Sequence, residues 1–428
     1  MNTLLKLFRF PVQKIRKLQS GSGKVCSHAD HNILCPDKKE KENRWKDWFF
    51  FFICFLLLFC SFYHNSLATA FDLLPGDDGD TRFNLLIVEH WIQFFRGELS
   101  FGEARMFYPV NYGLGFSDLS LGVALLEWPL RVMGLDLYRA TQMIYYLLHF
   151  SGAAACFYLL RKQLHLNLIP SLGGMMVICF GNSLYLKLIH TQFYSYFLLP
   201  LLLVLLIHYC RYPAETGFVK RQLTLAAAAL SGLWILYTGF YTIFFAGFFT
   251  VVFGIFCLLT FLYRQDPKDF SAFRQWLKIR IPEILITFIF SLLALIPFLK
   301  IYLPVVRLGF RRTWQEISPC LLKPCDFFNV GSENVLWSKW LTSLFPQQLE
   351  RAFVHEVQYG LPLLTLFLLS GAFLFFICRF KKGMKTEQAY FIAMIFALFF
   401  CMLAISAGDG LQAPWNTIRK LPVASAIR

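Results

Sequence analysis

The sequence predicts an all-α polytopic membrane protein with about nine transmembrane helices and a large first outer loop. Of the 428 residues, 57% are hydrophobic and 16% are charged, and the mean hydropathy is +0.52. Soluble domains carry about a quarter charged residues. Several apolar runs also reach the roughly 20 residues that a helix needs to cross a bilayer. This composition excludes soluble globular, disordered, collagen-like and disulfide-scaffold proteins.

The first 46 residues predict a basic cytoplasmic tail. They carry eleven Lys and Arg residues and no long apolar run, and cationic residues collect on the cytoplasmic side of membrane proteins. The net charge of +15 therefore indicates orientation, and we expect no nucleic-acid partner. The apolar run from Trp48 to Tyr63 follows a lead-in too long and charged for a signal peptide. We interpret it as the uncleaved first span of a transmembrane domain over residues 47–428, with the N-terminus in the cytoplasm.

The acid-rich segment 71–137 predicts the large first outer loop. It contains ten Asp and Glu residues but only four Arg residues, the reverse of the balance expected for a cytoplasmic loop. Its stretch 119–134 is apolar but is interrupted by Glu127, Pro129 and Arg131. We therefore expect an interfacial or re-entrant helix there rather than a span.

Eight further apolar segments predict the remaining spans. They lie near 138–160, 169–186, 194–210, 223–240, 241–263, 281–303, 358–378 and 386–406. In this topology 25 of the 41 Lys and Arg residues fall in cytoplasmic segments, as the positive-inside rule requires, and 304–357 forms a second outer segment. Most spans lack a charge near the middle, where His149 is the main ionisable group. This scarcity argues against ion-coupled transport.

The densest polar cluster follows the first span and contains Asp77, Asp78 and Asp80. Three carboxylates within four residues repel one another, so they persist most easily where a cation, an Arg or a sugar hydroxyl offsets the charge. The alternative is structural. Asp80 is a favourable N-cap for a helix from about Thr81 to Arg96, and the other two carboxylates can be solvated.

The helix after this cluster carries Arg82, Glu89 and Arg96 at spacings of seven, with His90 beside Glu89. This spacing places the first three on one face, where they form either a site or a solvated stripe. Asp118 stands immediately before the apolar stretch. It is either the cap of that helix or a second acidic site residue.

Further polar residues lie at the predicted outer surface. His190 occupies a short outer turn and Glu356 opens the penultimate span. A lone histidine at a membrane interface is more often structural than catalytic. Arg307, Arg311 and Arg312 follow another span, and guanidinium groups pair bidentately with phosphate. They are candidates for binding a lipid phosphate, with plain surface charge as the alternative.

Several motifs together resemble those of a family of bacterial multi-pass proteins with the architecture of GT-C glycosyltransferases. The main ones are GDDGDTRFN (76–84), LIVEHW (86–91), FYP (107–109) and SDLSLG (117–122). The likeness continues through 158–161, 190–192, 325–328, 355–360 and 422–428. It covers nearly all of the chain after the tail, and its assignment to an enzyme class is a fold-level analogy.

The resemblance implies an inverting membrane glycosyltransferase. Its partners would be a sugar linked to a polyprenyl phosphate, membrane lipid, and an envelope glycan or lipid acceptor outside the bacterial cytoplasmic (inner) membrane. GT-C enzymes keep an acidic residue in the first outer loop, where a carboxylate can take the proton of the acceptor hydroxyl. Asp80 is the expected base, Asp77 its alternative, and Asp118 a further member of the acidic site. The candidate substrate-binding residues are Arg82, Glu89, His90, His190, Arg311, Arg312 and Glu356.

Two further expectations accompany this reading. The residues require no cofactor or metal ligand set, although a divalent metal is compatible with the cluster. Members of the resembled family continue beyond the position of Arg428 with further spans, so the sequence is expected to be cut short. The rival function is a non-catalytic membrane component or a transporter of lipid-linked saccharides. An enzyme should gather Asp77, Asp80, Asp118 and His190 around one cavity, whereas a scaffold need not.

Overall fold

Every regular element in the part that the computed structural model describes is a helix. That part comprises residues 38–76, 78–102, 104, 106, 112–187, 190–264, 267–309, 313–321, 323, 326, 328–331, 334, 336–344, 358, 360, 386–404, 415–418 and 420. Within these residues, turns and irregular segments join the helices and no strand is present. This confirms the predicted all-α class.

The elements vary from single turns to helices of 28 residues. In chain order they are α2 (Lys38–Phe62), α3 (His64–Ala68), α4 (Asp80–Phe95), η3 (Gly113–Phe116), α5 (Leu121–Val132), α6 (Leu137–Tyr158), η4 (Leu159–Gln163), α7 (Leu168–Phe180), α8 (Asn182–Lys187), η5 (Thr191–Leu198), α9 (Leu199–Arg211), α10 (Phe218–Thr238), α11 (Phe240–Arg264), α12 (Pro267–Ala294), α13 (Ile296–Arg307), α14 (Trp314–Ile317), η6 (Ser318–Cys320), α15 (Ser338–Leu344), α17 (Thr386–Ala404) and α18 (Trp415–Ile418).

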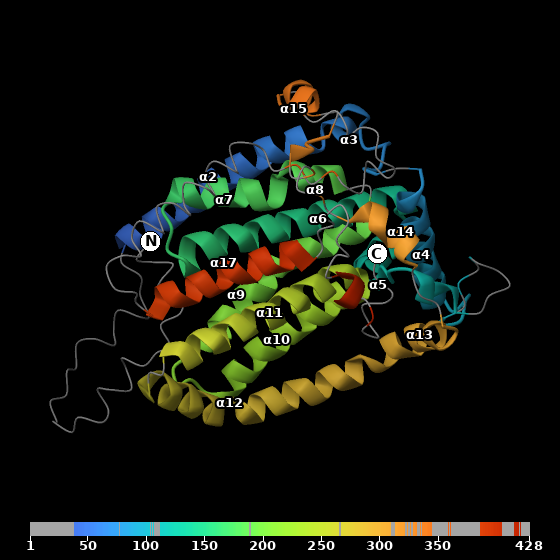
Figure 1. Cartoon of the computed structure of the whole chain (residues 1–428). Helices are drawn as coiled ribbons and strands as arrows, with labels where there is room; N and C mark the ends of the chain where they lie inside the picture. Colours follow the sequence, from blue (N-terminus) through green and yellow to red (C-terminus); the bar gives the residue numbers. More distant parts are fainter. Residues whose placement is uncertain are drawn as a thin grey trace.

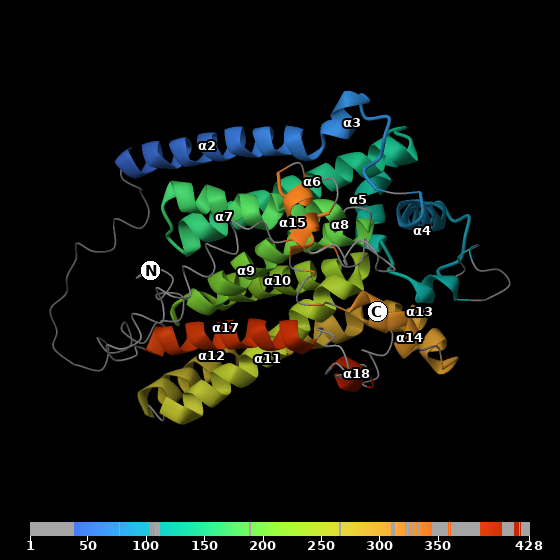
Figure 2. The same ribbon diagram turned by 45° about the horizontal axis from the view of Figure 1, so that its top comes forward.

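The long helices lie side by side with their axes nearly aligned, and the short elements gather mainly at one end (Figures 1 and 2). We call this the loop end; it holds α4, α5 and the start of η5. At the opposite end, α6 and α9 finish and α10 and α12 begin. We call it the basic end, because Arg161, Lys162, Arg211 and Arg221 lie there. Asp47 of α2 binds both Arg161 (3.0 Å) and Lys162 (3.1 Å) at this end.

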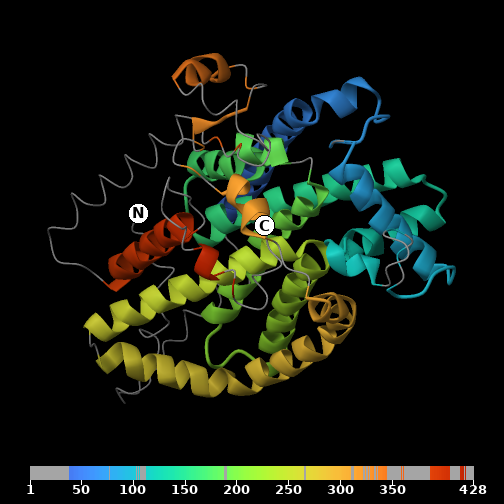
Figure 3. The same cartoon turned by 45° about the vertical axis from the view of Figure 1, so that its right-hand side comes forward.

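Five described helical segments are long and apolar enough to cross a membrane. They are Trp45–Phe62, Leu137–Gln163, Leu168–Lys187, Gln192–Arg211 and Phe240–Leu262. A sixth is the pair α12 and α13, which meets the same test as one unit although the chain bends by 51° between them (Figure 3). These helices are those of a multi-pass membrane protein, and they correspond to six of the nine predicted spans.

The other three predicted spans have different outcomes. Segment 223–240 lies mainly in α10, which packs between α9 and α12; Arg221 and Gln222 in its first turns reduce its apolar character. Segment 386–406 includes α17, whose described apolar part is Ile392–Cys401. Segment 358–378 lies almost entirely outside the described residues. The nine-span topology therefore stays a prediction, as does the re-entrant character of 119–134, which contains the twelve-residue helix α5.

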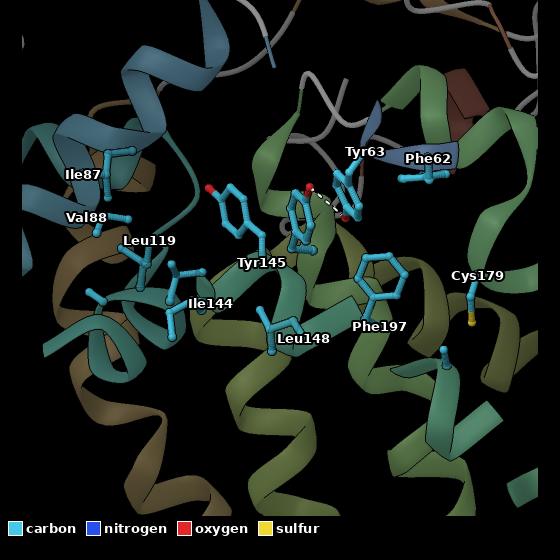
Figure 4. Packing of buried hydrophobic residues seen from close by; sticks show 14 of the residues in the cluster. Phe62, Tyr63, Ile87, Val88, Leu119, Ile144, Tyr145, Leu148, Cys179 and Phe197 are labelled. Carbon is cyan, nitrogen blue, oxygen red and sulfur yellow. Dashed lines mark hydrogen bonds between the residues drawn. The ribbon is translucent and has the colours of Figure 1, made fainter. Parts of the chain in front are cut away.

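The main hydrophobic core joins the loop end to the bundle. Ile87 and Val88 of α4 and Leu119 before α5 face Ile144 and Leu148 of α6 (Figure 4). All five side chains are buried. The amphipathic α4 is therefore fixed against the bundle by its apolar face, and its first turn is held next to the start of η5.

A buried polar chain lies within this core. His149 of α6 donates from Nε2 to the Cys179 carbonyl oxygen (2.8 Å), and its Nδ1 lies 2.9 Å from the Tyr63 hydroxyl. The Tyr63 hydroxyl is also 3.3 Å from that of Tyr194, whose ring stacks on Tyr145. Because a carbonyl oxygen can only accept, a neutral His149 accepts from Tyr63 at Nδ1. The central ionisable residue of the spans thus has two hydrogen-bond partners and serves packing.

The bend between α12 and α13 has a specific hydrogen-bond partner. The Tyr237 hydroxyl of α10 donates to the Ala294 carbonyl oxygen (2.6 Å) and accepts from the Phe298 N–H (3.1 Å). Both groups lose helical partners at a break and need others when they are shielded from water. Tyr237 therefore fixes the direction in which α13 leaves the bundle.

The close approach of α6 to η5 requires a glycine at position 152. A Cβ atom there would lie 2.5 Å from the carbonyl oxygen of Phe197. Gly152→Ala should therefore lower the free energy of unfolding by about 1–3 kcal/mol, the usual cost of overpacking. Thermal unfolding in detergent measures the effect. Gly173→Ala is the control, because nothing lies within 4 Å of its added Cβ; equal stability of the two variants would contradict the close contact.

Candidate functional site

Asp80 is the first residue of α4, and its carboxylate is held by a histidine from a distant segment. The Nδ1–H of His190 donates to Asp80 Oδ2 at 2.7 Å. The N-cap of α4 is Gly79, without a side-chain cap. The capping role considered for Asp80 is therefore wrong: the helix begins one residue before the predicted Thr81, and the carboxylate turns towards η5. The Asp80 side chain is 52% exposed and that of His190 11%.

Asp118 is buried on the inner side of this pair. Its Oδ1 accepts a hydrogen bond from the Phe240 N–H at 2.8 Å, and Phe240 is the first residue of α11. Asp118 thus caps a helix, but α11 rather than the predicted α5, whose N-cap is Ser120. Next to it, the Tyr302 hydroxyl of α13 donates to the Ser117 carbonyl oxygen at 2.5 Å. Asp118 is thus held directly by α11, and the residue before it by α13.

Asp118 and His190 are close enough to interact through their charges. Burial raises the pKa of Asp118 from 3.8 to about 7, while the hydrogen bond from Phe240 and the proximity of His190 act in the opposite direction. The structure therefore brings Asp80, His190 and Asp118 together at the loop end. An exposed carboxylate, an imidazole and a buried carboxyl group in this order can accept, hold and pass on a proton.

An amide network supports the pair, and its residues lie in the motifs 76–84, 117–122 and 190–192 without being among the predicted site residues. Asn84 Nδ2 donates to the Asp80 carbonyl oxygen (2.8 Å) and to Gln192 Oε1 (3.1 Å). The Ser120 hydroxyl donates to Asn84 Oδ1 at 3.2 Å. Asn84 stands one helical turn after Asp80, so helical spacing could have indicated that the two lie on one face. Gln192 follows His190 by two residues, and no spacing rule pointed to it. This network joins α4, η5 and the start of α5.

The other predicted site residues on α4 are Arg82, Glu89 and His90, and each contacts neighbouring residues of the fold. Arg131 NH2 of α5 donates to Glu89 Oε2 at 2.8 Å, which ties α4 to α5. Arg82 is largely exposed, 3.8 Å from Asp78. His90 is buried with its ring edge-on to Trp91, and burial lowers its pKa to about 4. Glu89 and His90 therefore belong to the packing of α4 against its neighbours.

Glu127 of α5 is a fully buried carboxyl group beside the Glu89–Arg131 pair. Burial raises its pKa to about 7, with Thr141 and Arg131 acting in the opposite direction and Glu89 reinforcing the rise. A buried carboxyl group without a strong charge partner favours its neutral form. Burial therefore makes this carboxyl group easier to protonate than a solvent-exposed one.

Four predicted site residues lie outside the described residues. They are Asp77, Arg311, Arg312 and Glu356. Arg307, the neighbour of this arginine group, ends α13 and is exposed. Among the residues that are described, no cluster of three or more His, Cys, Asp or Glu side chains could hold a metal ion.

The fold and the site define a class: a multi-pass helical membrane protein with a carboxylate–imidazole–carboxyl group at one end of its bundle. Comparisons with protein-family models, curated proteins and solved structures gave no match.

The buried state of Asp118 predicts a specific pH dependence of stability. Between pH 3.8 and about 7 the folded protein keeps a proton on Asp118 that the unfolded chain has lost. In that window this group lowers the free energy of unfolding by about 1.4 kcal/mol for each unit of rising pH. Asp118→Asn should remove this contribution, because an amide does not titrate. The hydrogen bond should remain, since the amide oxygen can still accept from the Phe240 N–H.

Unfolding in detergent from pH 4 to pH 8 tests the prediction. His90, with its lowered pKa, gives a contribution that rises with pH, and Glu127 one that falls. Both residues are present in wild type and variant, so the difference between the two curves isolates Asp118. The variant should gain stability relative to wild type as the pH rises. Parallel curves would show that Asp118 is ionised throughout.

Proposed function

We propose that the protein is a membrane glycosyltransferase that transfers a sugar from a polyprenyl-phosphate donor to an envelope glycan or lipid acceptor. The observation that carries this proposal is the contact between Asp80 and His190 beside Asp118 at the loop end. The motif resemblance to GT-C enzymes supplies the reaction class. Under this proposal the loop end faces outward and the basic end faces the cytoplasm, as positive-inside statistics favour.

Each residue of the site has a role in such a reaction. The half-exposed Asp80 carboxylate accepts the proton of the acceptor hydroxyl as its oxygen attacks the anomeric carbon. His190 positions that carboxylate, and its own ring is oriented by the Asp80 contact. Asp118 lies behind His190 and stabilises positive charge on the imidazole when ionised. Arg311 and Arg312 remain the candidates for stabilising the leaving lipid phosphate.

The direct test is a comparison of lipid-linked saccharides and envelope glycans in a strain with the gene, a deletion strain and a complemented strain. Loss of the enzyme should leave an acceptor that lacks one sugar, together with accumulation of a polyprenyl-phosphate-linked donor. Complementation should restore the product. An unchanged glycan and saccharide profile in the deletion strain would contradict the proposal. Accumulation of a finished lipid-linked saccharide on one membrane face would instead favour the transporter alternative.

A further inference from the structure

Asn84 is a buried side-chain amide that bonds to three separate parts of the chain. Its residue is 3% exposed. Nδ2 donates to the Asp80 carbonyl oxygen (2.8 Å) and to Gln192 Oε1 (3.1 Å), and Oδ1 accepts from the Ser120 hydroxyl (3.2 Å). Since a backbone carbonyl can only accept, the contact with Asp80 fixes which end of the amide carries the N–H groups. Both N–H groups and the oxygen are therefore satisfied, as burial of an amide requires.

Each partner of this amide belongs to a segment that carries one residue of the candidate site. Asp80 is itself a site residue at the start of α4. Gln192, in η5, follows His190 by two residues, and Ser120 follows Asp118 by two residues. The amide therefore lies at the junction of the three segments that meet in the site.

The turn between α10 and α11 holds two of these segments independently. The Ser120 N–H donates to the Thr238 carbonyl oxygen at 3.1 Å, and a Cβ atom on Gly239 would lie 2.7 Å from the Gln192 carbonyl oxygen. The same turn provides the N–H that Asp118 accepts. Ser120 also has a φ of 47°, a left-handed conformation that a non-glycine residue keeps only where its surroundings hold it. The start of η5 and the segment before α5 are thus fixed to one turn, and the buried amide extends this arrangement to α4.

From these contacts we propose that Asn84 is a positioning residue of the site, which sets the distance and orientation between Asp80 and His190. Its donors tie the first turn of α4 to η5, the two segments between which the 2.7 Å contact is made. Because the residue is buried, it acts through these two side chains rather than on a substrate. A displacement of about 1 Å within a site can lower a reaction rate about 10²-fold. The catalytic part of this inference rests on the proposed glycosyltransferase function, whereas the positional part does not.

The first test follows the ring of His190 by NMR of the purified full chain with ¹⁵N-labelled histidine. In a neutral imidazole, hydrogen bonds decide which nitrogen bears the proton, and correlations from the carbon-bound ring protons report it. The wild type should show the Nδ1–H tautomer that the Asp80 contact requires. Asn84→Ala should lose this single tautomer and show a mixture with Nε2–H. The chain has nine histidines, and the signals that are missing in His190→Gln identify the relevant ring.

Gln142→Ala is the matched control. Gln142 is also a buried amide, 1% exposed, which donates to the Phe71 carbonyl oxygen (2.9 Å) and accepts from the Tyr146 hydroxyl (3.1 Å). Both substitutions should lower the unfolding temperature, because each leaves buried groups without partners. Only Asn84→Ala should change the His190 tautomer. An unchanged tautomer in a folded Asn84→Ala would overturn the proposal.

The second test measures sugar transfer by the same variants. Asn84→Ala should lower kcat about 10–100-fold and leave KM within about twofold of wild type, because the residue aligns the base without binding substrate. Gln142→Ala should keep both values. Equal losses of kcat in the two variants would reduce Asn84 to packing and overturn its positioning role. If the wild type transfers no sugar, the proposed function fails, and the His190 tautomer alone decides the positional role.

Two milder variants decide the question if Asn84→Ala does not fold. Gln192→Leu removes the acceptor of one Nδ2–H group, and Ser120→Ala removes the donor to Oδ1. Each takes away one of the three bonds of the buried amide. A mixed tautomer of His190 in either variant would support the proposal, with the larger change in Gln192→Leu, which cuts the link to η5. The single Nδ1–H tautomer in both would overturn it.

Discussion

Asp80→Asn should lower the rate of sugar transfer by about 10²–10⁴-fold, the usual effect of removing a general base. The amide cannot take the proton of an acceptor hydroxyl, but its oxygen can still accept the hydrogen bond from His190. The site geometry, with its 2.7 Å contact between the two side chains, should therefore survive the substitution. Expression and unfolding temperature should remain close to those of wild type. The measurement is transfer in the purified protein, or restoration of the glycan in a deletion strain.

Asp78→Asn is the matched control for this substitution. Asp78 lies two residues before Asp80, and its side chain is 97% exposed, 3.8 Å from Arg82. The same chemical change there should leave the transfer rate within about twofold of wild type, since exposed surface charges contribute little. Wild-type transfer by Asp80→Asn would exclude Asp80 as the base and direct attention to Asp77. Equal losses in the two variants would indicate a general effect of local charge.

Glu283→Ala should produce the largest loss of stability among substitutions far from the loop end. Arg221 binds Glu283 Oε1 through Nε (2.8 Å) and NH2 (2.6 Å), and Glu283 is completely buried, so the substitution leaves Arg221 buried without its carboxylate. Breaking a buried ion pair in this way costs about 3–5 kcal/mol. Arg221 also donates to the carbonyl oxygens of Ala214 (3.1 Å) and Thr216. The loss should therefore loosen the turn between α9 and α10 as well. Thermal unfolding in detergent and proteolysis of this turn provide two independent readouts.

Glu215→Ala is the control, because Glu215 is an exposed acid in the same turn. Its free energy of unfolding should change by no more than about 0.5 kcal/mol. The double variant Glu283→Ala with Arg221→Ala should recover part of the loss, since it removes the cation that Glu283→Ala leaves unpaired. Equal effects of Glu283→Ala and Glu215→Ala would show that the buried pair contributes nothing to stability.

The local pattern of apolar and polar residues predicted the helices well, because a helix depends on residues that are close together in sequence. The helix expected from Thr81 to Arg96 is α4, Asp80–Phe95, and the acid-rich cluster contains Asp80, which the structure brings to His190. Partners across the fold were harder to predict. Asp80 and His190 are 110 residues apart, and Asp118 and Phe240 are 122 apart. Sequence alone gives no register between such segments, so the cap on α11 and the amide network of Asn84 required the structure.

The role of Asp118 at the start of α11 sets an order in which the site can form during synthesis. Chains emerge from the ribosome N-terminus first, so Asp80 can meet His190 before residue 240 exists. Asp118 then has no N–H from Phe240 to accept. Only after α11 has entered the bundle does the buried carboxyl group gain its anchor. The hydrogen bond of Asp118 therefore depends on a downstream helix, whereas the contact between Asp80 and His190 uses only residues that are synthesised before it.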